Sequence, residues 1–328
     1  MRLILVIAVV VFSGVASAQG HGQDPSGVGV TIERGVGFLA RDARVWKKEH
    51  NCGSCHHAAL VIWAMREARG RGIAVDEPEL AGLTKWVAES GDGKFAMTRP
   101  AGAPHAASPK AMYFALALGV DPEPDAVSRA GMKRLLKTVE DEQIDNGSWS
   151  AWPGSRPPIL GGSDESLTAL AVLALMPEAA AGDEPAKAAR DRGIRWLSET
   201  KSDDDPQSVA MRLILWARLG RPAGEWSPLV RRIQERQNAD GGWSQTKDMP
   251  SDAWATGQAL YALASAGIAP DEPAVARGRA FLIRTHRDDG SWPMTSRPTA
   301  PGDKGSQSLI PIIGAGSAWA ILGLVRGG

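Results

Sequence analysis

The sequence has little of several residue types that would point to particular protein classes. Its 328 residues include only two cysteines, two tyrosines and five phenylalanines, and its 37 basic residues equal its 37 acidic ones. Two cysteines exclude a framework of several disulfides. The charge balance gives no support to binding of nucleic acid or of an anionic membrane surface. No apolar run is long enough to form an integral membrane span.

The N-terminal segment has the three parts of a secretory signal peptide. Arg2 supplies a positive start, residues 3–12 form a short apolar run, and Ala16-Ser17-Ala18 is a small-residue cleavage site. We expect residues 1–18 to be removed on export, which places the mature protein in the periplasm or outside the cell. Residues 19–30 are glycine-rich and polar, which predicts a disordered N-terminus before a fold spanning residues 31–328.

A short motif of the form Q-x-x-x-G-x-W recurs along the chain. Residues 143–149 and 237–243 match it, residues 286–292 match with His in place of Gln, and residues 89–95 form a degraded copy. A helix-favouring run precedes each copy and a small-residue run follows it. Regular recurrence indicates a repeat architecture. Several of the twelve tryptophans occupy repeat positions, so we interpret the tryptophan excess as architectural.

Turns that combine glycine, an acidic residue and proline divide the chain into helical hairpins. The six predicted hairpins span about 31–72, 76–119, 122–181, 184–220, 225–267 and 272–326. Their second helices are rich in small residues, which allow close packing, and are predicted to start near His56, Ser108, Ser163, Pro206, Ser251 and Ile313. We therefore predict an all-α fold, a single α/α toroid with inner and outer rings of helices.

The repeats and the small-residue inner helices resemble the terpenoid cyclase and prenyltransferase superfamily, of squalene–hopene cyclase type, over roughly residues 31–326. The resemblance implies a cavity that binds an apolar or isoprenoid-type small molecule. The repeat residues themselves have a structural interpretation. A Gln amide can bond helix-end carbonyls, Gly permits the turn, and Trp packs over the next hairpin.

The strongest chemical signal is Cys52-Gly-Ser-Cys55-His56, followed by His57. C-x-x-C-H is the attachment pattern of c-type haem, in which both thiols bond the haem and the histidine ligates iron. A second iron ligand stays open among His57, His105, Met65, Met97 and Met112. A transition metal such as zinc, held with His56 and His57, is one alternative. A strained Cys52–Cys55 disulfide or two free thiols is another.

The resemblance also implies an acid motif, D-x-D-D-T-A, which this sequence lacks. The nearest acidic stretches contain Asp164, Asp204 and Asp252, which are the candidate catalytic acids. All three lie where helix caps are expected, so capping is the favoured interpretation. Likewise the repeated Arg-Pro pairs at Arg99, Arg156 and Arg297 are lettered as loop braces rather than as a ring of cations around an anionic ligand.

The leading hypothesis is an exported cyclase-like protein that binds an apolar or isoprenoid-type ligand, with a haem or metal site at Cys52, Cys55 and His56. Enzymatic activity is left open. One alternative is a redox protein in which the toroid carries a c-type haem. Another is a binding or assembly module without chemistry. No sequence pattern predicts the oligomeric state.

Overall fold

The computed structural model describes residues 27–50, 53–90, 107–151, 158–159, 163–298 and 308–328. The predicted signal peptide lies outside these ranges, as do Cys52, His105, Met97, Arg99 and Arg156. None of the helices in the described ranges combines the length and the hydropathy needed to cross a bilayer.

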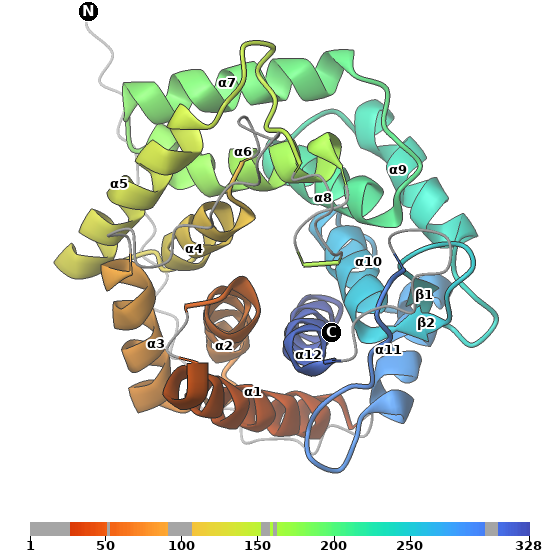
Figure 1. The fold of residues 1–328 in the computed structure, drawn as a ribbon. Helices are drawn as coiled ribbons and strands as arrows, with labels where there is room; N and C mark the ends of the chain where they lie inside the picture. The colour runs from red at the N-terminus through yellow and green to blue at the C-terminus, as the bar shows by residue number, and fades with distance from the viewer. Residues whose placement is uncertain (1–26, 51–52, 91–106, 152–157, 160–162, 299–307) are drawn as a thin grey trace, which may run out of the picture.

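The helices form two concentric rings, and consecutive helices alternate between them (Figure 1). The outer ring consists of α1 (Val28–His50), α3 (Glu77–Glu89), α5 (Ala126–Asp141), α7 (Glu184–Glu199), α9 (Ala223–Glu235) and α11 (Pro273–Thr285). The inner ring consists of α2 (Leu60–Gly70), α4 (Pro109–Gly119), α6 (Asp164–Ala180), α8 (Pro206–Arg218), α10 (Ala253–Ser265) and α12 (Ile310–Arg326). The predicted all-α toroid is confirmed.

Burial follows from composition, as the small-residue pattern predicts. The inner helix α6 is buried on all sides from Glu165 to Leu175, whereas its outer partner α7 buries only a stripe of four residues. A helix that is apolar all round is buried, and one with a single apolar stripe lies at a surface. The inner ring is therefore the core of the protein.

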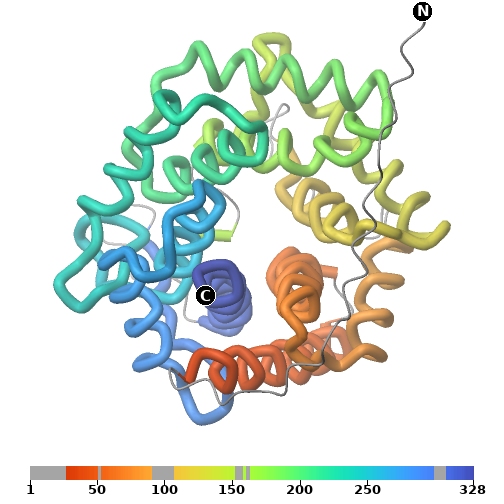
Figure 2. Tube along the Cα trace, turned by 180° about the vertical axis from the view of Figure 1, so that it is seen from behind, coloured from red at the N-terminus to blue at the C-terminus, as the bar shows by residue number. Residues whose placement is uncertain are grey.

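The ring closes where the first and last inner helices meet. Helix α12 packs against α10 on one side and against α2 and α1 on the other (Figure 2). At the first contact, Gly257 of α10 and Gly323 of α12 bring the two backbones together. A Cβ added at Gly323 would lie 2.8 Å from the carbonyl oxygen of Gly257. Glycine is required here because any side chain would hold the helices apart.

The Q-x-x-x-G-x-W motif links each hairpin to the next. Gln237 Nε2 donates to the carbonyl oxygens of Gly241 at 2.8 Å and Ala274 at 2.7 Å, and Ala274 belongs to the next outer helix. The indole nitrogen of Trp243 donates to the carbonyl of Ile233 at 2.6 Å. Gln143 and Trp149 make the equivalent contacts one repeat earlier. The structural interpretation of the motif is confirmed.

Some local features differ from the expectation. Helix α1 begins at Val28 rather than near residue 31, because Val28, Ile32 and Val36 continue one buried stripe. A π-helix, η1 (Cys55–Ala59), precedes α2. Two short strands, β1 (Trp243–Ser244) and β2 (Ser251–Asp252), pair antiparallel before α10.

Candidate functional site

The first turns of neighbouring inner helices lie together at one end of the toroid. Because outer and inner helices alternate along the chain, every inner helix enters the ring from the same end. Two pockets lie at this end. The smaller encloses about 220 Å³ and is lined by the first turns of α4, α6 and α8. The larger has about 440 Å³ of empty space, including the part open to solvent, and lies between α8, α9 and α10.

Gln207, at the start of α8, lines both pockets. The larger pocket has an apolar wall that includes Val209, Ala210 and Ala259. Its dimensions fall within the range of small-molecule sites, which combine apolar walls with a few polar groups. The pocket is therefore the best-formed candidate binding site among the described residues.

The same pocket contains polar side-chain atoms that have no hydrogen-bond partner in the described part of the protein. They are Gln207 Oε1, Arg236 Nη1, Gln245 Oε1, Trp254 Nε1 and Gln258 Nε2. Gln207, Gln245, Trp254 and Gln258 are each at least nine-tenths buried. Unpaired buried polar groups are costly, so a concentration of them in one pocket requires a partner.

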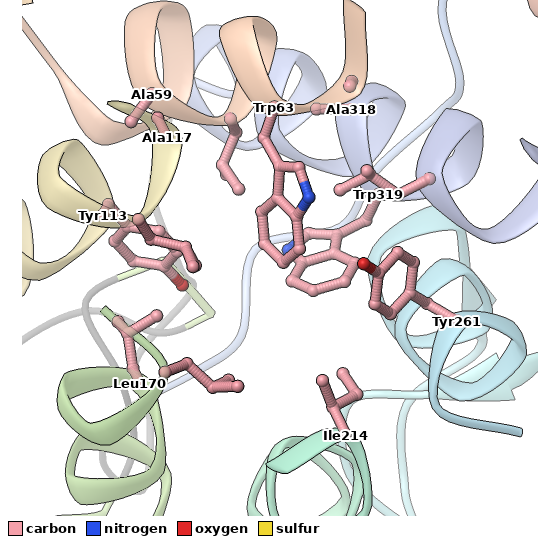
Figure 3. Close-up of a cluster of buried hydrophobic side chains, with 14 of the residues drawn as sticks. Ala59, Trp63, Tyr113, Ala117, Leu170, Ile214, Tyr261, Ala318 and Trp319 are labelled. Carbon is pink, nitrogen blue, oxygen red and sulfur yellow. The ribbon is translucent and has the colours of Figure 1, made fainter. Parts of the chain in front are cut away.

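Below the pockets, aromatic and aliphatic side chains fill the centre of the ring (Figure 3). Trp63, Tyr261 and Trp319 meet edge to face, with ring centroids 5.2 to 5.9 Å apart. Tyr113, Leu170 and Ile214 close the opposite side and are buried. This centre is packed, so the space open to a ligand is at the inner-helix entry end.

The three candidate acids have different environments. Asp252 is the N-cap of α10: its Oδ1 accepts from the backbone nitrogen of Ala255 at 2.9 Å. Its Oδ2 accepts from Gln245 Nε2 at 2.7 Å. Burial raises the pKa of Asp252 to about 6, against the lowering effect of these hydrogen bonds. A carboxyl group with a raised pKa is the kind that can act as an acid near neutral pH.

Asp204 and Asp164 lie in surroundings of another kind. The Asp204 side chain is 90% exposed and pairs with Arg232 and Arg236. Its hydrogen bond from Arg232 is the main cause that lowers its pKa. Asp164 Oδ1 accepts from the backbone nitrogen of Ala151 at 2.7 Å, and the cap of α6 is Ser163. Of the three, Asp252 alone is buried beside a pocket-lining residue, Gln245.

The histidines of the C-x-x-C-H-H motif form a cluster with the end of α1. Trp46 stacks on His57 with ring centroids 4.5 Å apart and on His50 with centroids 3.8 Å apart. His57 Nε2 lies 2.8 Å from Asp42 Oδ2, so the carboxylate orients the ring. The Nδ1 atoms of His56 and His57 then contact each other. Burial is the main cause that lowers the pKa of His56 well below its usual value, followed by the nearby His57 and His50.

A carboxylate behind a histidine is the usual support for a metal-ligating imidazole. The neutral form of His56 is the form that ligates metals. Cys55 is buried, and Cys52 lies outside the described residues. Within the described ranges, no group of three or more His, Cys, Asp or Glu side chains is arranged to hold a metal ion.

Sequence reasoning missed several residues of these sites. The buried glutamines Gln207, Gln245 and Gln258 carry no motif, although glutamine in an otherwise apolar inner helix is a usable signal. Asp42 lies on an outer helix where acidic residues are common. Arg297, interpreted as a brace on backbone carbonyls, instead donates from Nη1 to Asp205 Oδ1 at 3.2 Å, which ties its loop to the start of α8.

The sequence profile of the squalene-hopene cyclase N-terminal domain matches residues 205–296. This segment contains every lining residue of the larger pocket except Pro158 and Arg297. No curated protein matches the chain in sequence.

Several solved structures share the fold. A possible member of the GH105 family from Salmonella enterica is 12% identical, with a TM-score of 0.61 and coverage of 98% of each chain. A similar protein from Klebsiella pneumoniae is 13% identical, with a TM-score of 0.59 and the same coverage. A variant of the type II terpene cyclase MstE from Scytonema, in complex with geranylgeranyl dihydroxybenzoate, is 13% identical. Its TM-score is 0.54, and the match covers 92% of this chain and 97% of that one.

At these identities the likeness shows the fold, a cyclase-like α/α toroid, and not an activity. The profile match adds a sequence similarity to the squalene-hopene cyclases that is confined to residues 205–296.

Proposed function

We propose that this protein binds an apolar small molecule of isoprenoid type at the inner-helix entry end of the toroid. The observation that carries the proposal is the pocket between α8, α9 and α10, whose wall is largely apolar. The squalene-hopene cyclase similarity covers nearly the whole of that wall. The fold is also that of a terpene cyclase whose structure holds a geranylgeranyl compound.

If the bound molecule reacts, Asp252 is the acid that we propose to test. Its buried carboxyl group lies behind Gln245, and its pKa of about 6 keeps a substantial protonated fraction near neutral pH. Asp204 is less suited, because its two arginine partners stabilise the ionised carboxylate.

A pocket-filling substitution tests the binding proposal. Ala210 is 3% exposed and lines the pocket, so Ala210→Leu places additional carbons in the space that a ligand needs. Geranylgeraniol should bind to the purified wild-type protein in equilibrium dialysis and lose at least about tenfold in affinity for the variant. Ala223→Leu, at an exposed position on α9, is the matched control. Absence of binding to the wild type, or equal binding to Ala210→Leu, would contradict the proposal.

The histidine cluster supports a second function, as a metal-carrying site. We propose that the exported chain holds a transition metal such as zinc, or a c-type haem, at Cys52, Cys55, His56 and His57. The supporting observation is the Asp42–His57 pair, which turns the Nδ1 atom of His57 toward His56. Cys55 is buried beside the buried Tyr113, and this favours a small ion over the haem macrocycle.

The full chain with its signal peptide, expressed together with a haem-attachment system, distinguishes these cofactors. Intact mass and the visible spectrum report attached haem, and metal analysis of the same sample reports a bound ion. His57→Ala should remove at least most of the bound metal, whereas His286→Ala, in the last repeat, should not. A mature protein without haem or stoichiometric metal would refute the second function. N-terminal sequencing tests export, with Gln19 as the expected first residue.

A further inference from the structure

Five side chains at the larger pocket each present a buried polar atom without a partner among the described residues. Three of these atoms are donors: Trp254 Nε1, Gln258 Nε2 and Arg236 Nη1. Two are acceptors, Gln207 Oε1 and Gln245 Oε1. A purely apolar ligand would leave all five unsatisfied and would seal them from water, so it would bind at a cost.

The orientation of the two acceptors is fixed by the other ends of their amides. Gln245 Nε2 donates to Asp252 Oδ2 at 2.7 Å and to the carbonyl of Thr295 at 3.2 Å. Gln207 Nε2 donates to the carbonyl of Pro158 at 3.2 Å. Because each amide nitrogen is engaged, each amide oxygen is held ready to accept.

The charges at the pocket are already balanced. Arg297 Nη1 pairs with Asp205 at 3.2 Å, and Arg236 Nη2 pairs with Asp204. An anionic ligand would have to compete with these carboxylates or bring its charge into the pocket without a dedicated cation. A hydroxyl group, by contrast, both donates and accepts, which matches a pocket that contains donors and acceptors together.

From these observations we infer that the pocket recognises an uncharged hydroxyl-bearing group on its ligand, with the two glutamine oxygens accepting and the Trp254 and Gln258 nitrogens donating. The inference rests on the proposed function, because it names the polar end of the isoprenoid-type ligand. It separates an isoprenoid alcohol or hydroxylated ring from both a hydrocarbon and a diphosphate.

Three probes with the same fifteen-carbon chain test this inference: farnesene, farnesol and farnesyl diphosphate. The expected order of affinity for the full-length mature protein, measured by tryptophan fluorescence and equilibrium dialysis, is farnesol above both others. One to two additional hydrogen bonds should give farnesol an advantage of roughly tenfold over farnesene.

Two variants remove single donors with little change of shape. Trp254→Phe deletes the indole nitrogen, and Gln258→Met deletes the amide. Each should reduce farnesol affinity by about fivefold to tenfold and leave farnesene affinity unchanged or raised. Gln234→Met on α9, whose amide donates to Glu272 outside the pocket, is the matched control and should change neither.

Each result has a distinct meaning. Equal affinity for farnesol and farnesene would leave the apolar ligand in place and overturn the hydroxyl-recognising group. Tightest binding of the diphosphate would overturn the assignment of an uncharged group. Unchanged farnesol affinity in both variants would mean that ordered water alone satisfies the buried atoms, and the inference would fail. Binding of none of the probes would remove the proposed function itself.

Discussion

A methyl group added at Gly257 should open the ring at the contact between α10 and α12. The added Cβ would lie 2.7 Å from the backbone nitrogen of Ala320 and closer still to the carbonyl group of Trp319. Ordinary contacts of a Cβ begin at 3.4 Å. Both obstacles are backbone atoms, so no side-chain rotation relieves them, and the helices must separate by on the order of 1 Å.

The magnitude follows from two opposing effects. Overpacking against backbone costs about 3 kcal/mol, while replacing glycine by alanine within a helix returns about 1 kcal/mol. Gly257→Ala should therefore lower the free energy of unfolding by about 2 kcal/mol, and the Tm by roughly 5 °C. Urea and thermal unfolding, followed by circular dichroism, measure both quantities.

Gly82→Ala in the outer helix α3 is the matched control. A Cβ at Gly82 meets no atom within 4 Å, so only the helix-propensity gain applies. This variant should be stabilised by about 0.5–1 kcal/mol. The packing argument is refuted if Gly257→Ala is as stable as the wild type, or if the two alanine variants change stability by the same amount.

Three further predictions concern buried polar groups and the repeat motif. Because burial raises the pKa of Asp252 to about 6, the stability of the neutral carboxyl group is present below pH 4 and lost as the pH rises through 6. Asp252→Asn should therefore gain up to ~3 kcal/mol on the wild type between pH 4 and 7 in urea unfolding, and a constant difference would contradict this. Arg212 pairs with Glu165 at 2.5 Å, and both side chains are buried. Arg212→Met should cost about 3–5 kcal/mol in thermal unfolding, and less when combined with Glu165→Gln; equal costs would refute the pairing argument. Gln237→Ala removes two hydrogen bonds between hairpins and should cost roughly 1–3 kcal/mol in the same assay, whereas an unchanged Tm would deny the motif its linking role.

The sequence predicted the architecture well because the architecture depends on repeated local signals. The inner helices begin at residues 60, 109, 164, 206, 253 and 310, within a few residues of the starts that capping residues and small-residue runs indicated. The largest deviation is at α2. There the π-helix Cys55–Ala59 takes up the predicted start at His56, and Ser54 accepts a hydrogen bond from the backbone nitrogen of His57.

The sites were less predictable because they depend on contacts between distant segments. Gln207 and Gln258 meet at one pocket only after two hairpins have packed side by side. Asp42 and His57 come from different helices, and neither residue type marks such a pair in advance. The same holds for Asp252: capping was expected at that position, but its pKa depends on how completely the fold buries it.

The closed ring also bears on how the chain is made. An open array of helical hairpins can fold one unit at a time, with each unit stabilised by its neighbours. Here α12 packs against both α10 and α2, so those inner surfaces stay uncovered until the last inner helix has been synthesised. The contact between α2 and α12 joins segments more than two hundred residues apart, and such distant contacts slow folding. An incomplete chain would expose the apolar faces of α2 and α10 together, the condition under which holding by a chaperone is most useful.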